Sequence, residues 1–287
     1  MKSLGLFSLS NSLKFFTPKE ELKIFYFSVA LYNFALSFVQ IFIPLYLFKK
    51  GFPLSLILLF FALSQLGRLL FLPLAAHLSS SFGAKKIIAI AFVFQVIYFF
   101  FLQKIDYFSV GFWGSVIFYG AIWAFLYLPY HVHFSKIAPN ETRGKIIGRI
   151  NSYSAVFSAA GPLLGGIIIT KYGFNWAFLL AILIIIPAIA LLLSTPEASK
   201  IRKINFSLVK IKGVYPDLIA NGFFNFQDFI NIIMWPLFIF IIIPQYQTIG
   251  FIQTISLFIS LIAFHSVGKL TDKFNRSKLL FIRQYLK

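Results

Sequence analysis

The feature that most constrains this chain is a succession of almost unbroken apolar runs. A helix needs about 20 apolar residues to cross a hydrocarbon core roughly 30 Å thick, and these runs are long enough to do so. We expect membrane spans at residues 23–48, 54–78, 87–103, 108–133, 150–170, 175–194, 213–244 and 247–267, with a ninth beginning near Leu279. The predicted fold class is therefore an all-α integral membrane bundle of about eight complete helices.

Composition agrees with this class and excludes others. The chain is 59% hydrophobic and 12% charged, more apolar than a water-soluble fold of 287 residues could hide. It has no cysteine, which removes disulfides and Cys-based metal sites, and we expect neither a metal nor a cofactor. It also has no phosphate-binding loop, Ser-His-Asp set or metalloprotease motif. We therefore expect neither an ATP-driven pump nor an enzyme.

The basic residues predict how the chain is oriented in the membrane. Of the 26 Lys and Arg residues, the alternate loops hold only four, whereas 21 fall in five segments: 1–23, 79–86, 134–149, 196–212 and 267–287. Basic loops collect on the cytoplasmic side of a membrane. We therefore expect a cytoplasmic N-terminus and a multi-pass protein of the cytoplasmic (inner) membrane. The same distribution explains the net charge of +18 without a nucleic-acid partner.

The sequence repeats itself at an offset of 192 residues. This shift places Pro44 on Pro236 and the loop at 76–86 on the loop at 268–278. It also carries the first span onto the seventh and the second onto the eighth. One offset that produces all these matches indicates a duplication.

The repeat predicts the domain organisation. We expect an N-terminal six-helix half at 1–195, a cytoplasmic linker at 196–212 and the beginning of a second half at 213–287. Two parallel six-helix halves with a substrate site between them form a known transporter architecture. A second half of equal length would end near residue 386, since 194 and the offset of 192 add to that position. We therefore expect a truncated second half, and a separately encoded C-terminal fragment as one partner.

The charged loop after the second and eighth spans resembles a motif of the major facilitator superfamily, approximately Gly-x-Leu-x-Asp-Arg-x-Gly-Arg-Lys. The first copy keeps Leu78, Gly83 and Lys85, whereas Ser80 and Ser81 replace the acidic and basic pair. The resemblance implies a helical bundle of that family with a cytoplasmic latch, weakened in the first copy. The latch residues that it implies are Gly83, Lys85, Gly268, Asp272, Lys273 and Arg276. An ordinary positively charged turn is the alternative for Asp272.

The fifth span carries a glycine-rich pattern. Gly148 and the later Gly161, Pro162, Gly165 and Gly166 are similar to a signature that the same family associates with antiporters, although Phe157 replaces one glycine. Small residues let helices approach closely and proline bends a helix, so tight packing explains the pattern equally well. Against antiport, the fourth span lacks the arginine that many proton-coupled exporters of the family carry.

Two polar stripes predict a central pathway for substrate and ions. One starts at Asn33 in the first span and the other at Asn221 in the seventh, each with polar residues recurring on one helical face. Polar faces are costly in hydrocarbon unless they meet protein or water, so a shared cavity is expected. Hydrogen bonding between helices is the alternative. The pathway residues expected from the stripes are Asn33, Gln40, Asn221, Asn225, Asp228 and Trp235.

Two ionisable residues, Arg68 and Asp228, lie near the middle of predicted spans. Such residues cost about 2.5–3.5 kcal/mol at a helix centre on insertion scales and are therefore functional candidates. Asp228 is expected to bind a cationic substrate or to carry a coupling proton. Arg68 is expected to bind an anionic group or to hold Asp228 ionised. A structural ion pair is the alternative for both, and snorkelling to an interface is a further one for Arg68.

An aromatic stripe at Tyr119, Trp123 and Tyr127 suits stacking on a flat or sugar-like substrate, with plain packing as the alternative. His131 and His133 have no cysteine or carboxylate beside them, so interfacial histidines are expected rather than a metal site.

Together these features predict a secondary active transporter that moves a small molecule by alternating access. The finer expectations are proton coupling and export by antiport, which make the substrate, protons and the bilayer the expected partners. The alternative is a non-transporting membrane protein, either a truncated remnant or a partner-binding or sensory relative.

Overall fold

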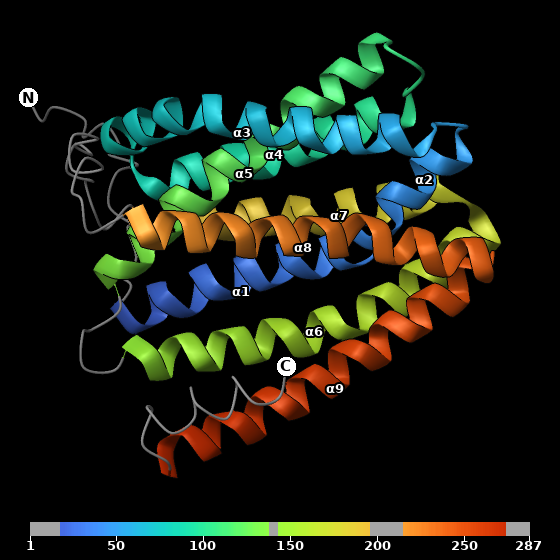
Figure 1. The fold of residues 1–287 in the computed structure, drawn as a ribbon. Helices are drawn as coiled ribbons and strands as arrows, with labels where there is room; N and C mark the ends of the chain where they lie inside the picture. The colour runs from blue at the N-terminus through green and yellow to red at the C-terminus, as the bar shows by residue number, and fades with distance from the viewer. Residues whose placement is uncertain (1–17, 138–142, 196–214, 274–287) are drawn as a thin grey trace, which may run out of the picture.

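The computed structural model describes residues 18–137, 143–195 and 215–273, and the regular elements within these ranges are all helices. The helix axes are roughly aligned, successive long helices point in opposite directions, and together they form a single bundle (Figure 1). In chain order they are α1 (Pro18–Ser37), the 3-10 helix η1 (Gln40–Phe42), α2 (Ile43–Lys49), α3 (Leu54–Phe82), α4 (Ala84–Gln103), α5 (Val110–Ile137), α6 (Arg143–Tyr172), α7 (Phe174–Leu193), α8 (Tyr215–Ile242) and α9 (Tyr246–Lys273). The expected all-α class is confirmed for the described residues.

Six segments of the described ranges are long and apolar enough to cross a membrane, from Glu20–Lys49 to Phe174–Leu193. Helices α8 and α9 carry shorter apolar stretches, Ile230–Ile242 and Tyr246–Ile262. That these two helices also span the bilayer, and that the N-terminus is cytoplasmic, stay predictions. The expected ninth span near Leu279 and the linker at 196–212 lie outside the described residues.

The turn between α3 and α4 is shorter than expected. Instead of a loop at 79–86, a single residue, Gly83, separates the helices with a φ of 96° that L-residues rarely adopt. The preceding serines are nonetheless helical, and their hydroxyls donate to carbonyls one turn earlier, as Ser79 does to Ala75 at 2.6 Å. The second copy also differs from the expected loop, since Gly268, Asp272 and Lys273 lie within α9.

The first span is one long helix interrupted near its middle. Helix α1 ends at Ser37 and α2 begins at Ile43, with η1 between them. Pro44 has no N–H to donate to the Gln40 carbonyl, which instead accepts a bond from the backbone N–H of Ile43. The break therefore follows from the proline, and it places Gln40 at a point where the helical ladder is open.

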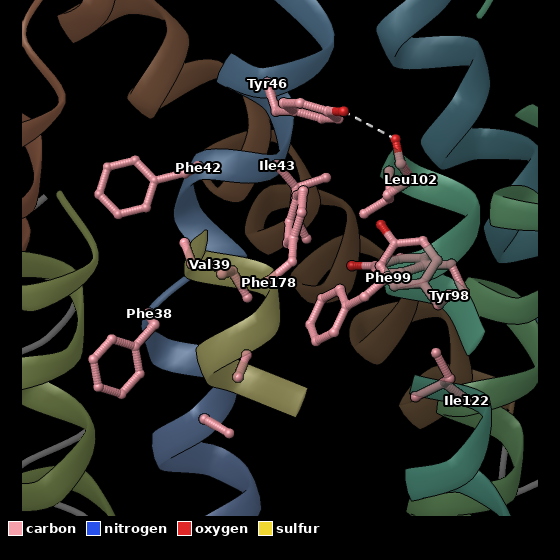
Figure 2. Packing of buried hydrophobic residues seen from close by; sticks show 14 of the residues in the cluster. Phe38, Val39, Phe42, Ile43, Tyr46, Tyr98, Phe99, Leu102, Ile122 and Phe178 are labelled. Atoms are coloured by element: carbon pink, nitrogen blue, oxygen red, sulfur yellow. Dashed lines mark hydrogen bonds between the residues drawn. The ribbon is translucent and has the colours of Figure 1, made fainter. Parts of the chain in front are cut away.

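The core joins the first span to α4 and α7. Phe99 and Phe178 are buried side by side between these elements, and the Tyr46 hydroxyl donates to the Leu102 carbonyl at 3.1 Å (Figure 2). Nearer the other end, the Tyr32 hydroxyl donates to Gln95 at 3.1 Å. Inside a bilayer, helix association rests on close packing and such interhelical hydrogen bonds. Phe38 and Phe42 belong to the same buried cluster and extend from the opposite side of the first span to Phe99 and Phe178 (Figure 2).

Candidate substrate cavity and its closed end

A cavity of about 770 Å³ lies between the first span, α6, α8 and α9. Its polar lining residues are Asn33, Ser37, Gln40, Ser158, Asn231 and Gln253. The other described lining residues are apolar, among them Ile41, Pro162 and Trp235, and none of the described lining side chains is charged. The cavity therefore offers neutral amide and hydroxyl groups to a ligand.

The structure brings together three residues of the predicted pathway. Asn33 and Gln40 come from the first span and Trp235 comes from α8, and all three line this cavity. The side chains of Asn221, Asn225 and Asp228 lie outside the described residues. The position of Asp228 can still be related to the cavity. It is three residues before Asn231 and seven before Trp235 on α8, so the three residues share one helical face.

Sequence reasoning missed three of the polar lining residues. Asn231 extends the stripe of the seventh span by three residues from Asp228, so its signal was present in the sequence. Ser158 follows Asn151 and Ser154 at helical spacing, and Gln253 precedes Ser256 and Ser260 at the same spacing, so a weak polar periodicity was present for both and was not used. They line the cavity because α6 and α9 pack beside each other, as Figure 1 shows.

The predicted packing glycines of α6 lie at close helix contacts. A Cβ atom on Gly165 would lie 2.0 Å from the Phe38 carbonyl oxygen, and one on Gly166 would lie 2.5 Å from that of Tyr246. A Cβ on Gly161 would meet the side chain of Ser37. From the facing helix α9, Gly250 packs equally closely on the backbone of Pro162. These contacts bring α6 against both the first span and α9.

Four aromatic rings, Phe42, Phe174, Phe240 and Tyr246, pack together where η1, α7, α8 and α9 meet, and we call them the Tyr246 cluster. Phe42 directly follows the lining residues Gln40 and Ile41 in the chain. The Tyr246 ring centroid lies 5.0 Å from that of Phe240, 5.2 Å from that of Phe174 and 6.4 Å from that of Phe42. The Lys49 ammonium lies 5.7 Å from the Tyr246 ring and 5.8 Å from the Phe174 ring. Such ring and cation–π contacts contribute about 0.5–1.5 kcal/mol each.

Arg68 and the aromatic stripe lie together, but not on this cavity. The guanidinium carbon of half-buried Arg68 on α3 lies 5.3 Å from the centroid of the Tyr127 ring on α5. The stripe is continuous, with centroid separations of 6.1 Å from Tyr119 to Trp123 and 5.1 Å from Trp123 to Tyr127. Neither Arg68 nor the stripe is among the described residues that line the cavity.

The predicted latch residue Lys85 forms a buried ion pair. Its ammonium donates to the Glu21 carboxylate and, at 2.8 Å, to the Thr195 hydroxyl. These contacts join the ends of α1, α4 and α7. The surroundings of Gly268, Asp272 and Lys273 are not described, and Arg276 lies outside the described residues. Removing one partner of a buried ion pair costs about 3–5 kcal/mol, because the remaining charge is left buried without compensation.

Comparison with known families gives one match that covers most of the chain. A sequence model of the Major Facilitator Superfamily matches residues 25–283. The matched range runs from α1 through the end of α9 and so includes both the cavity and the Tyr246 cluster. A comparison with curated proteins gives no match.

Proposed function

Because this chain belongs to the major facilitator superfamily, a family of membrane transporters, we propose that it is a secondary active transporter whose substrate passes through the cavity lined by Asn33, Gln40 and Trp235. The observation that carries the proposal is the position of this cavity between helices from both parts of the predicted repeat. We propose that the Tyr246 cluster, which is next to Gln40 and Ile41 in the chain, closes one end of it.

The mechanism that we propose is alternating access between two six-helix halves with a cytoplasmic N-terminus. Opening the closed end requires separation of Tyr246 from Phe174 and of Gly250 from Pro162, which are contacts between α9 and the helices of the first repeat. Neither contact involves the buried core around Phe99 and Phe178, so we propose that the closed end separates while that core stays packed.

The experiment that tests alternating access uses the absence of cysteine from the chain. Gln253→Cys places a single thiol on the cavity wall. In vesicles of both orientations, a membrane-impermeant thiol reagent should label this residue from either side, with rates that change in opposite directions when a proton gradient is imposed. Labelling from one side only, under every gradient, would exclude alternating access.

We propose that Asp228 carries the coupling proton. Its position on α8 shares a helical face with Asn231 and Trp235, both of which line the cavity, and no other acidic residue of α8 lies beyond its first turn. Asp228→Asn should abolish substrate-dependent proton flux into dye-loaded proteoliposomes. Asp106→Asn, which changes an exposed acidic residue of the α4–α5 turn, is the matched control and should leave the flux unchanged. Equal proton flux in both variants would refute the assignment.

The direction that we propose is export by antiport, on the similarity of the α6 glycines to the antiporter signature. Proteoliposomes with the substrate inside and an inward proton gradient should lose it faster than those without a gradient. Faster uptake of external substrate under the same gradient would reverse the direction.

A further inference from the structure

A second cavity of about 500 Å³ adjoins the first. It lies between the end of α2, the start of α3 and the C-terminal half of α8. Asn231 and Trp235 line both cavities, so the two volumes meet at these side chains. Each volume falls in the range of about 300–1,000 Å³ that is usual for small-molecule sites.

The two cavities differ in chemistry. The second is lined by Phe48, Leu54, Met234, Phe238 and Ile241 with their apolar side chains, and Asn231 is its one polar residue among those described. The first cavity instead presents several neutral hydrogen-bonding groups. The indole of Trp235 stands at the junction and is 54% exposed. An indole has an apolar body and one N–H donor, which suits a boundary between polar and apolar surroundings.

We infer that the two cavities form one binding site for a single-chain amphiphile, whose polar head lies in the first cavity and whose alkyl chain lies in the second. The inference rests on the proposed function, since it names the class of substrate that the transporter carries. The head is hydrogen-bonding, because the described lining residues of the first cavity offer amide and hydroxyl groups. The chain matches the apolar walls between Phe48 and Ile241.

The two residues that the cavities share support this occupant over a covering protein segment. A segment packed on the apolar groove would need only the apolar walls, and it would not account for the amide of Asn231 at the junction. An amphiphile accounts for both, because Asn231 can bond to the head while its neighbour Met234 contacts the first methylenes.

Tryptophan fluorescence tests the site directly, because Trp235 is one of four tryptophans. A variant with Trp113→Phe, Trp123→Phe and Trp176→Phe keeps Trp235 as its only indole. The matched control keeps Trp176 instead, which is 58% exposed compared with 54% for Trp235. Both are placed in phosphatidylcholine nanodiscs and titrated with a monoacylglycerol that carries bromine atoms, which quench indole fluorescence, on its chain.

We expect saturable quenching of Trp235, reaching half its maximum at a probe concentration that leaves Trp176 largely unquenched. Asn231→Leu should raise that concentration about tenfold, by removing the hydrogen bond to the head. Asn175→Leu, at an exposed asparagine of α7, should leave it unchanged. A brominated alkane without a head should bind at least tenfold more weakly than the monoacylglycerol.

Three results would overturn the inference. Equal and non-saturable quenching of both tryptophans would mean that the groove contacts bulk lipid only. No quenching of Trp235 would mean that protein covers the groove. Equal binding of the alkane and the monoacylglycerol would mean that the first cavity takes no head group.

The binding site and the proposed transport function can be rejected independently of each other. If Trp235 is saturably quenched but proteoliposomes never move the probe between leaflets or compartments, the binding site is supported and transport of this ligand is rejected. If proteoliposomes transport a polar solute that the probe does not inhibit, transport stands and the amphiphile site is wrong.

Discussion

The closed end of the cavity should open when Gly250 is replaced by alanine. Gly250 lies at the start of α9, and an added Cβ would lie 2.2 Å from the Pro162 carbonyl oxygen of α6. Ordinary contact begins at 3.4 Å, so the two helices would have to separate by about 1.2 Å, which is 3.4 minus 2.2. Overpacking of this kind costs about 1–3 kcal/mol. At 1.4 kcal/mol for each factor of ten, the closed form should lose population by about 5- to 140-fold.

Thiol labelling measures this change. The reporter is Gln40→Cys, which lies on the cavity wall opposite α9, and the reagent is added from the side where α2 turns into α3. The control is Gly67→Ala, because a Cβ on Gly67 would lie 3.8 Å from Gly120, an ordinary contact. Both changes exchange glycine for alanine within a helix, so their effects on helix propensity, about 1 kcal/mol, cancel in the comparison.

The expected result is a labelling rate at least fivefold higher in Gly250→Ala than in Gly67→Ala, with both proteins eluting as monodisperse particles. Equal labelling rates in two folded variants would refute the conclusion that the contact between α6 and α9 holds this end closed.

Three further changes give separate results. Tyr246→Ala should raise the same labelling rate, whereas Tyr246→Phe, which keeps the ring contacts, should not. Equal labelling rates in the two variants would mean that the ring does not help to close this end. Glu21→Gln should lower the free energy of unfolding by about 3–5 kcal/mol, because it removes the carboxylate that faces the buried Lys85 ammonium. Adding Lys85→Met to this variant should recover part of the loss, and a further loss would contradict the pairing. Gly173→Ala should lower stability by about 1–3 kcal/mol in the same measurement, although nothing lies within 4 Å of the added Cβ. The reason is that φ 89° with ψ 172° is a conformation that only glycine adopts readily, and a loss near zero would contradict this.

The sequence predicted most of the helices because the bilayer imposes a simple rule. Apolar length and short polar turns are local properties, so the expected spans at 54–78 and 87–103 coincide with α3 and α4 to within a few residues. The ends were less predictable. The serines before Gly83 were expected to form a polar loop, yet they are helical and their hydroxyls donate to carbonyls of the preceding turn, which leaves no free polar group to mark a loop.

The cavity was predictable only in part, because periodicity shows which residues share a face and not where that face points. The face of Asn33 and Gln40 and the position of Trp235 were found because the repeat sets the first and seventh spans opposite each other. Arg68 offered no such partner, and it lies over Tyr127 rather than on the cavity. The pairing of Lys85 with Glu21 joins residues 64 positions apart, a contact that neither motif nor spacing contains.

The closeness of the cavity to the Tyr246 cluster suggests how a ligand could control closure. Gln40 on the cavity wall is two residues from Phe42 in the cluster, and Pro236 is four residues from Phe240. Pro236 and Phe240 are therefore separated by about one helical turn, roughly 5.4 Å, whereas Gln40 and Phe42 are the two ends of the short helix η1. A ligand shifts the equilibrium only if it binds the closed and open forms with different free energies. A ligand that bonds to Gln40 in the closed form alone would hold the broken segment η1, and with it Phe42, against Tyr246. Closure would then depend on the ligand through the short helix η1, while the buried helices α4 and α7 keep their positions.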